Sequence, residues 1–233
     1  MASMTTPAVP LAEAGPEYGV GVYRQITDWA ATTPGWMQTL GEIGTDFGVV
    51  VFAVLLLLQW WRARRREDRS MALALLAPVA VAGVYALSEA VKSWLHEERP
   101  CRAVPDVRTI AVCPAPGDWA FPSNHSVIAA ASAATLLLTW RVVAAFALPL
   151  AVLVALSRVY VGVHYLHDVA AGALLGVVLA PVILLTLMVP GTRAVTRLRR
   201  HRALIFVLGT APRPAPRPAP AAPDPRHATA SHP

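Results

Sequence analysis

The segment Ser-Arg-Val-Tyr-Val-Gly-Val-His-Tyr-Leu-His-Asp, residues 157–168, lies between two apolar runs that have the character of membrane spans. It nevertheless carries an arginine, two histidines and an aspartate, and ionisable groups in such a place are costly without a role. His164 and Asp168 are four residues apart, so on a helix they share a face and the carboxylate can hold the imidazole. Arg158 adds a planar, permanently charged group suited to phosphate. The segment has the outline of a nucleophile acting on a bound oxyanion, although a single His–Asp contact is more often structural.

The composition around this segment is that of an integral membrane protein. Of the 233 residues, 55% are hydrophobic and only 15% are charged, whereas soluble domains carry about 25% charged residues. The length allows about five to six helical spans in one bundle. We therefore expect an all-α, polytopic transmembrane helical bundle. The net charge of +6 comes from clustered arginines. In a membrane protein such clusters indicate the orientation of the spans rather than nucleic-acid binding, so no nucleic-acid partner is expected.

Three regions follow from the distribution of apolar and polar residues. Residues 1–45 form an N-terminal segment, in which the mixture of aromatic and charged side chains over 20–45 predicts an amphipathic helix at the membrane interface. Residues 46–192 form the transmembrane bundle that holds the polar segments. Residues 193–233 are a basic, Pro/Ala-rich cytoplasmic tail that we expect to be largely disordered. The expected spans are residues 46–61, 71–91, 125–140, 142–157 and 168–190.

The arginines predict the orientation in the membrane. If the spans alternate, the arginine-rich segments 62–69 and 193–202 lie on one side, and an excess of Lys and Arg marks the cytoplasmic side. Residues 92–121 and 158–167 then lie on the opposite, extracytoplasmic face. Cys101 and Cys113 share the first of these loops, where oxidising conditions are consistent with a disulfide, although their spacing alone leaves the pairing open.

A second polar segment, Lys92 to Pro100, leaves the second expected span. Lys92 and Arg99 are seven residues apart, two helical turns, so both cations point the same way on a helix that Pro100 ends. Lys92 is the only lysine in the chain. It either supplies a compact ammonium that arginine does not replace, or extends from a helix end towards the headgroups.

A third polar segment, Pro122-Ser123-Asn124-His125, precedes the third expected span. If Pro122 and Ser123 open that helix, its free backbone N–H groups and positive dipole end form an anion site. The alternative is that Ser123 is only an N-cap and His125 an interfacial residue.

Together the three segments supply three cations, hydrogen-bond donors around Ser123 and two separate histidines, all on one membrane face. Such a set suits phosphoryl transfer, in which cations stabilise the charge, one histidine attacks and another protonates the leaving oxygen. The sequence lacks the carboxylate cluster of a two-metal site and the Gly-rich loop of a nucleotide site. We therefore expect neither a metal nor a cofactor.

At these residues the sequence resembles the type 2 phosphatidic acid phosphatase superfamily. The signature of that family is Lys-x6-Arg-Pro, then Pro-Ser-Gly-His, then Ser-Arg-x5-His-x3-Asp. The matching residues here are Lys92, Arg99 and Pro100; Pro122, Ser123, Asn124 and His125; and Ser157, Arg158, His164 and Asp168. Asn124 departs from the pattern, because the family often has glycine there.

The resemblance implies the role of each residue. His164 is the nucleophile that forms a phospho-histidine, Asp168 orients it, and His125 is the general acid for the leaving group. The phosphate-binding groups are those of Lys92, Arg99, Ser123, Arg158 and the backbone amide of Asn124. The family is expected to work without a metal. The side chain of Asn124 lies beside the phosphate in this interpretation, and asparagine tolerates a left-handed conformation better than most residues.

The forms Phe-Pro-Ser-Asn-His and Ser-Arg-Val-Tyr-Val-Gly-Val-His-Tyr look like bacterial undecaprenyl diphosphatases of the bacitracin-resistance type. This implies a lipid phosphate substrate in the bilayer of a bacterial plasma membrane and an extracytoplasmic active site. Phosphatases of phosphatidic acid, phosphatidylglycerol phosphate or decaprenylphosphoryl-phosphoribose would use the same residues. A non-catalytic lipid-binding or transport protein is the alternative from another class. The oligomeric state and the roles of His96, His167 and Glu89 stay open at this point.

Overall fold

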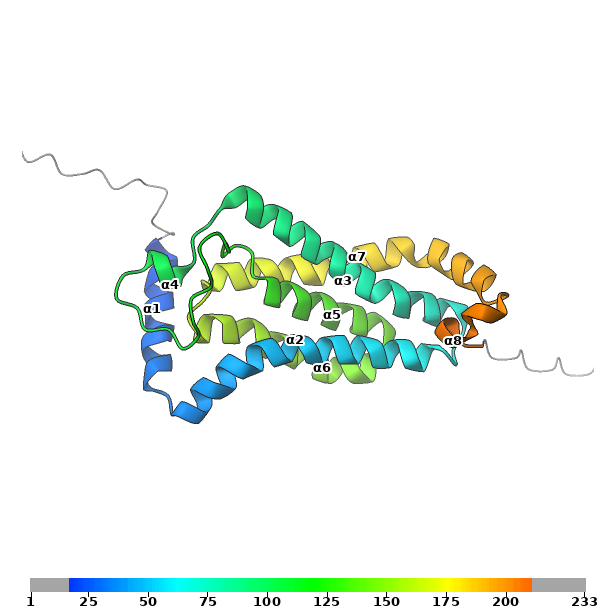
Figure 1. Cartoon of the computed structure of the whole chain (residues 1–233), viewed down its shortest axis with the longest axis horizontal. Coiled ribbons are helices and arrows are strands. Elements are labelled where there is room, and N and C mark those ends of the chain that lie inside the picture. Colours follow the sequence, from blue (N-terminus) through cyan, green and yellow to red (C-terminus); the bar gives the residue numbers. More distant parts are fainter. Residues whose placement is uncertain (1–16, 211–233) are drawn as a thin grey trace, which may run out of the picture.

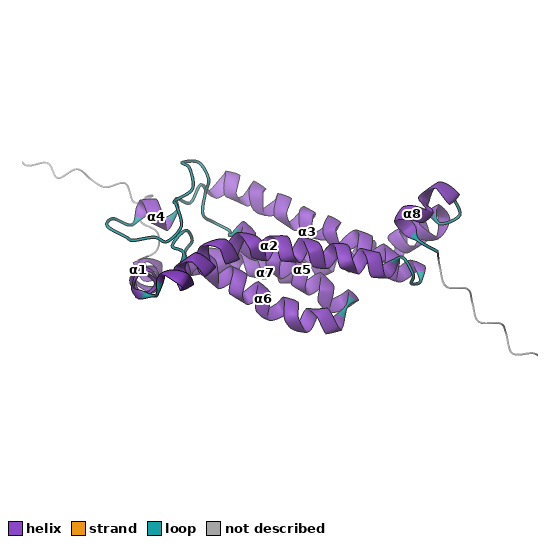
Figure 2. Cartoon of the chain, turned by 60° about the horizontal axis from the view of Figure 1, so that its bottom comes forward, coloured by secondary structure: helices purple, strands orange, loops and turns teal. Residues whose placement is uncertain are grey.

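The computed structural model describes residues 17–210, in which every regular element is a helix (Figures 1 and 2). Figure 1 shows an elongated bundle with α1, α4 and a long loop at one end and α8 at the other. The elements are α1 (Glu17–Thr32), α2 (Gly35–Ala63), α3 (Asp68–Leu95), α4 (Pro100–Ala103), α5 (Asn124–Thr139), α6 (Arg141–Tyr160), α7 (Leu166–Leu198), the 3-10 helix η1 (Arg202–Leu204) and α8 (Ile205–Leu208).

Four of these helices, α2, α3, α6 and α7, are long and apolar enough to cross a membrane, and α5 is a shorter apolar helix. The expected all-α transmembrane bundle is thereby confirmed. Large apolar side chains point away from the bundle, among them Phe47, Phe146 and Leu174. In water such a surface would be unfavourable, and in a bilayer it is the surface that contacts lipid.

Helix α5 lies at the centre of the bundle and packs against α2, α3, α6 and α7. All residues from Ser126 to Leu136 are buried except Ile128. Many of them are alanine, which lets the surrounding helices approach closely. Its 16 residues span only about 24 Å, less than the ~30 Å hydrocarbon core. Because longer helices surround it, its polar N-terminus can lie inside the protein rather than in lipid.

Two glycines of α7 allow this close packing against α5. A Cβ atom on Gly176 would lie 2.7 Å from both the amide nitrogen of Ala131 and the carbonyl oxygen of Val127. A Cβ atom on Gly172 would collide with the carbonyl oxygen of Ser123. Glycine at these two positions therefore sets the separation of the two helices, and with it the position of the residues at the start of α5.

The N-terminal amphipathic region is two helices, where the sequence predicted one over 20–45. α1 ends at Thr32, and α2 begins at Gly35 rather than at residue 46. The break falls at Pro34, which has no backbone N–H and disfavours helical geometry in the residue before it. The buried face of α1 contains Tyr23, whose hydroxyl donates to the carbonyl oxygen of Gly162 (2.7 Å). α1 thus lies across the end of the bundle that holds the polar segments.

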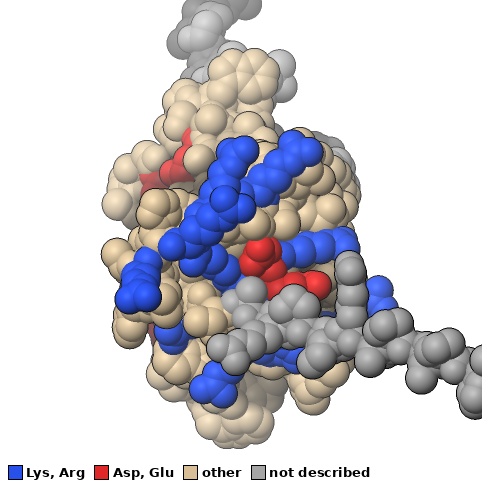
Figure 3. All heavy atoms as spheres, turned by 90° about the vertical axis from the view of Figure 1, so that its right-hand side faces the viewer, with Lys and Arg blue, Asp and Glu red and all other residues tan. Residues whose placement is uncertain are grey.

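At the opposite end of the bundle, arginine side chains gather around a few acidic ones (Figure 3). There α2 ends, α3 begins and α7 ends, and these segments contain the arginine-rich sequences 62–69 and 193–202. Arg199 donates to Asp68 (2.6 Å) and to the carbonyl oxygen of Leu208 (2.8 Å). Within residues 193–233, the tail expected to be largely disordered, α7 continues to Leu198 and is followed by η1 and α8. Residues 211–233, the rest of this tail, lie outside the described residues.

Cys101 and Cys113 form a disulfide, with their Cα atoms 5.9 Å apart. The sequence left this pairing open. The bond closes the loop that follows α4, and Arg102 reinforces it by contacting Glu98 and the carbonyl oxygen of Pro114.

We predict that Gly176→Ala lowers both the thermal unfolding midpoint of the detergent-solubilised protein and its activity. The added methyl group must displace the backbone of α5, and overpacking of this kind costs about 1–3 kcal/mol. Gly83→Ala is the matched control, because its Cβ atom would meet only Ile183 Cδ1 at 3.6 Å, an ordinary contact. Equal midpoints for the two variants would contradict the proposed role of Gly176.

Candidate active site

The three polar segments meet at the end of the bundle that α1 covers. Lys92 lies in the last turn of α3, Ser123 precedes α5, and Arg158 lies in the last turn of α6. His164 is in the turn between α6 and α7, and Asp168 is in the first turn of α7. The side chains that the sequence predicted for the site are almost all buried, with exposed fractions of 8% or less for Lys92, Arg99, Ser123, Arg158, His164 and Asp168.

His164 and Asp168 contact each other, although not on one helical face as the sequence predicted. α7 begins at Leu166, after His164. The carboxylate of Asp168 instead turns back: its Oδ2 accepts the backbone N–H of Tyr165 (2.8 Å) and lies 3.2 Å from Nδ1 of His164. One carboxylate therefore caps α7 and holds the imidazole, because both groups lie just before the first turn of that helix.

The neighbours of His164 define its tautomer. Nη1 of Arg99 lies 3.0 Å from Nε2 of His164, and a guanidinium can only donate, so Nε2 carries the lone pair. Nδ1 then carries the hydrogen and donates to Asp168. Burial lowers the pKa of His164 to about 3, with the charges of Arg99 and Arg158 adding to this effect and the hydrogen bond to Asp168 opposing it. The imidazole is therefore neutral near pH 7, with an unprotonated Nε2.

Lys92 and Arg99 lie near each other, although not on one helix as the sequence predicted. α3 ends at Leu95, where His96 adopts a left-handed conformation (φ 52°), and Pro100 begins α4 instead of ending α3. The two cations therefore do not share a helical face. They meet because the chain turns back and both approach Oδ1 of Asp118, Arg99 at 2.8 Å and Lys92 at 3.8 Å.

Asp118 is a site residue that the sequence analysis missed. It follows Gly117 in the long loop, and no spacing relative to the three motifs indicates it. Burial would raise the pKa of its carboxyl group, but the hydrogen bond and charge of Arg99 and the charge of Lys92 lower it, so the carboxylate stays ionised. A cavity of about 360 Å³ opens beside it, lined by Glu89, Lys92, Ser93, His96, Gly117, Asp118 and Trp119. Asp118 occupies the place where the two cations would hold an anion.

Asp46 of α2 is the second residue that the sequence analysis missed. Its Oδ1 lies 2.9 Å from Nε2 of His125 and 3.9 Å from Nη1 of Arg158. Nη1 of Arg158 also lies 3.3 Å from the hydroxyl of Thr45. His125 thus has a carboxylate partner, as His164 does, but one that comes from a distant helix and is largely exposed.

Two buried donors of the site have no hydrogen-bond partner among the described residues, the hydroxyl of Ser123 and Nε of Arg158. Buried donors without acceptors are rare, because each costs about 1–3 kcal/mol. The backbone N–H of Ser123, by contrast, donates to the carbonyl oxygen of Asp168 (3.0 Å). The two motifs are thereby joined, and their free donors suit an anionic ligand.

The side chain of Asn124 is hydrogen-bonded to residues of α3. Its oxygen accepts from the hydroxyl of Ser88 (2.7 Å), and its nitrogen contacts Glu89, which also lies 3.8 Å from Lys92. Asn124 is the first residue of α5 and needs no left-handed conformation. The asparagine in place of glycine therefore links α5 to α3. That its backbone amide binds phosphate stays a prediction.

The sequence profile of the PAP2 superfamily matches residues 73–190, which contain all three polar segments. The chain belongs to the PAP2 superfamily. An undecaprenyl-diphosphatase from Sulfolobus acidocaldarius is 36% identical over 66% of this chain and 68% of that protein. A decaprenylphosphoryl-5-phosphoribose phosphatase from Mycobacterium tuberculosis is 31% identical over 74% of this chain and 93% of that protein.

The fold is that of a membrane PAP2 protein. The crystal structure of a transmembrane PAP2-type phosphatidylglycerolphosphate phosphatase from Bacillus subtilis superposes with a TM-score of 0.52 at 22% identity, covering 77% of this chain and 88% of that chain. The family resemblance seen in the sequence is confirmed, and with its apolar helices the chain is a multi-pass membrane protein of a phosphatase family. The individual roles assigned to the PAP2 residues stay predictions.

We predict that Asp118→Asn lowers the KM of this PAP2 protein for its phosphate-bearing substrate about two- to fivefold. The half-exposed Asp118 side chain competes with phosphate for Lys92 and Arg99, and an exposed ion pair of this kind is worth about 0.2–1 kcal/mol. The measurement is steady-state kinetics, with inorganic phosphate as a competitive inhibitor that should also bind more tightly. Asp106→Asn removes the same charge from an exposed position of the same loop and should change neither constant. A raised KM in Asp118→Asn would show that the carboxylate supports binding instead.

Proposed function

We propose that the protein is an integral membrane lipid phosphatase that hydrolyses undecaprenyl (polyprenyl) diphosphate to the monophosphate and phosphate through a phospho-histidine. The observation that carries this proposal is the environment of Nε2 of His164. This unprotonated nitrogen lies against the buried guanidinium of Arg99, while Asp168 holds the other ring nitrogen. A nucleophile held between a phosphate-binding cation and an orienting carboxylate has the arrangement that attack on phosphorus requires.

In the first step the terminal phosphate binds to Lys92, Arg99 and Arg158 and to the free hydroxyl of Ser123. Nε2 of His164 attacks phosphorus as the bond to the bridging oxygen breaks. His125 donates a proton to that oxygen, and Asp46 orients His125. Asp168 remains hydrogen-bonded to Nδ1 and stabilises the positive charge that develops on the imidazole.

In the second step water attacks the phosphorus of the phospho-histidine. His125, which has given up its proton, now accepts one from the water. The P–N bond breaks, the electron pair returns to Nε2 of His164, and phosphate is released. No step in this sequence uses a group other than side chains of the chain and water.

An apolar groove on the side of the bundle supports a lipid substrate. It has a volume of about 290 Å³, lies between α5, α6 and α7, and is lined only by apolar side chains, among them Leu166, Val169 and Ala173. Leu166 and Val169 belong to the first turn of α7, so the groove reaches the end of the bundle that holds the site. A prenyl tail lying in this groove can stay at membrane depth while its diphosphate reaches His164.

The distribution of charge supports an active site on the extracytoplasmic face of a bacterial plasma membrane. The arginine-rich end of the bundle lies opposite the site (Figures 1 and 3), and an excess of Lys and Arg marks the cytoplasmic side. The Cys101–Cys113 disulfide lies at the end that holds the site and suits an oxidising compartment.

A second candidate substrate is a prenyl-linked sugar phosphate, favoured by the similarity to the decaprenylphosphoryl-5-phosphoribose phosphatase along almost its whole length. The same residues would perform that reaction. What distinguishes the two substrates is the leaving group, which is a lipid phosphate in one and a sugar hydroxyl in the other.

We predict that the purified protein, assayed with EDTA, releases phosphate from undecaprenyl diphosphate with a higher kcat/KM than from phosphatidic acid, phosphatidylglycerol phosphate or decaprenylphosphoryl-5-phosphoribose. His164→Ala should lower kcat by a factor of about 10³ or more, as loss of a nucleophile does. His201→Ala is the control, because His201 is exposed at the opposite end of the bundle, away from the site. A preference for another lipid would replace the proposed substrate, and full activity of His164→Ala would overturn the mechanism.

We predict that Ala173→Phe raises the KM for undecaprenyl diphosphate several-fold, because the ring fills the groove between α6 and α7. The KM for farnesyl diphosphate, whose shorter tail does not extend as far along the groove, should change less. Val182→Phe adds a ring on the lipid-facing side of the same helix and should leave both constants unchanged. Equal effects of Ala173→Phe on the two substrates would place the prenyl tail elsewhere.

A further inference from the structure

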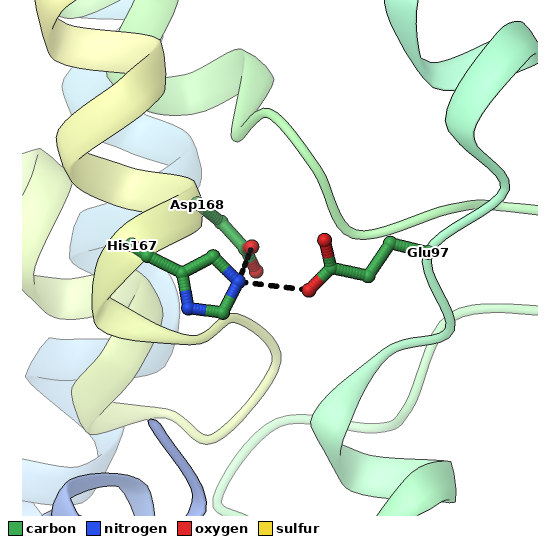
Figure 4. A group of neighbouring side chains, drawn as sticks. All are labelled: Glu97, His167 and Asp168. Carbon is green, nitrogen blue, oxygen red and sulfur yellow. Dashed lines mark hydrogen bonds and ion pairs between the residues drawn. The ribbon is translucent and has the colours of Figure 1, made fainter. Parts of the chain in front are cut away.

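A second cluster of ionisable side chains lies on the far side of Asp168 from the nucleophile. Glu97, in the segment between α3 and α4, and Asp168 both approach Nε2 of His167, in the first turn of α7 (Figure 4). Nε2 of His167 lies 2.8 Å from Oε1 of Glu97 and 3.1 Å from Oδ1 of Asp168. One ligand atom from each residue lies within 4.8 Å of the others. None of the steps proposed above uses Glu97 or His167.

The two oxygens of Asp168 differ in their environment. Oδ2 is satisfied by His164 and by the backbone N–H of Tyr165. Oδ1 is fully buried and has no hydrogen bond of acceptable geometry within the described part of the chain, although His167 lies nearby. A buried carboxylate oxygen without a hydrogen bond is unfavourable, even with the imidazole of His167 3.1 Å away. This oxygen points into the cluster in Figure 4 and has the free lone pairs that a cation would use.

The imidazole of His167 is held in place by aromatic neighbours. It stacks on Tyr165, with ring centroids 5.1 Å apart and an interplanar angle of 14°, and Phe121 lies 6.0 Å away on a tilted plane. The side chains of His167 and Glu97 are 24% and 27% exposed, whereas Asp168 is not exposed at all. The cluster is therefore rigid on its inner side and open to solvent on its outer side, so an ion can enter without rearrangement of the helices.

We propose that Glu97, His167 and Asp168 form a binding site for a first-row divalent cation of the Zn²⁺ type. Donor atoms about 2.0–2.2 Å from a tetrahedral Zn²⁺ are about 3.3–3.6 Å apart. The two measured pairs, at 2.8 and 3.1 Å, need to separate by only a few tenths of an ångström. One imidazole and two carboxylates suit Zn²⁺ better than Mg²⁺, which prefers oxygen ligands. Water from the exposed side completes the coordination.

The site is regulatory, because the chemistry proposed above does not use the ion. An ion on Oδ1 withdraws negative charge from Asp168, and the other oxygen of that carboxylate supports the positive imidazole that forms on His164. Bound Zn²⁺ therefore lowers the rate of phosphoryl transfer. This consequence for the rate rests on the proposed function, whereas binding of the ion does not.

The competing account is that the cluster is only a hydrogen-bonded link. In the ion-free protein the N–H at Nε2 of His167 donates to Glu97, which joins the segment after α3 to the start of α7. A link of this kind would persist without any measurable affinity for a cation, so measurement of binding separates the two accounts.

The experiment is isothermal titration calorimetry of the tag-free, EDTA-stripped, full-length protein in detergent, with ZnCl₂ as the titrant. We expect one saturable site in the wild type, weakened at least about tenfold in Glu97→Gln and in His167→Gln. His96→Gln and Glu98→Gln are the matched controls, because each changes the same residue type in the same segment outside the cluster; both should bind as the wild type does. Histidines elsewhere in the chain are present in all five proteins and cancel in the comparison. Equal binding by the wild type and His167→Gln, or no saturable binding by the wild type, would overturn the proposal.

A measurement on the wild type alone guards against misfolded variants. X-ray absorption at the zinc edge of the one-equivalent complex should show a shell of nitrogen and oxygen only, with the outer scattering of a single imidazole. A shell with two or more imidazoles, or with none, would place the ion elsewhere and overturn the proposal. In the phosphatase assay the zinc concentration for half-inhibition should rise at least about tenfold in Glu97→Gln. Unchanged inhibition in that variant would overturn the regulatory consequence, while the calorimetry decides the site.

Discussion

The arrangement of this end of the bundle depends on one electrostatic constraint: three cations, Lys92, Arg99 and Arg158, are buried beside a buried neutral histidine. A buried cation is stable only when an anion and hydrogen-bond acceptors replace the water it has lost. Within the described residues that compensation is partial. Asp118 contacts two of the cations, Asp46 approaches the third at 3.9 Å, and Nε of Arg158 has no partner. A bound phosphate would supply the missing negative charge and acceptors. The incomplete pairing of the cations, which destabilises the site without phosphate, therefore favours phosphate binding.

The constraint also explains why the helices pack as they do. The donors that a phosphate needs come from the start of α5, and the nucleophile comes from the start of α7, so the two helix ends must be in register. The glycines at 172 and 176 let the helices touch, and the hydrogen bond from the N–H of Ser123 to the carbonyl oxygen of Asp168 joins the two motifs directly. A short central helix surrounded by longer ones places this junction inside the protein. The PAP2 architecture thus creates a polar pocket without exposing polar backbone to lipid.

Asp168 connects the proposed nucleophile to the outer cluster of Glu97 and His167. Its carboxylate caps α7, holds His164 on one side and faces His167 and Glu97 on the other. Because these contacts share one carboxylate, any ligand of the outer cluster changes the support of the nucleophile. A regulatory ion would then act through Asp168 alone, without a conformational change of the bundle.

The sequence by itself determined the class of the protein, the number and approximate position of its apolar helices, and the family residues that gather at one end. Hydropathy and the spacing of charged residues are properties of short stretches of chain, so they can be interpreted without knowing how the helices pack. Only the tertiary structure decided how the residues meet. It showed that His164 lies before α7 rather than on it, that Lys92 and Arg99 converge through a turn at His96, and that Asn124 faces α3. It also brought Asp46 and Asp118 to the site from α2 and a loop. Contacts between distant segments depend on how whole helices pack, and no periodicity in the sequence encodes that.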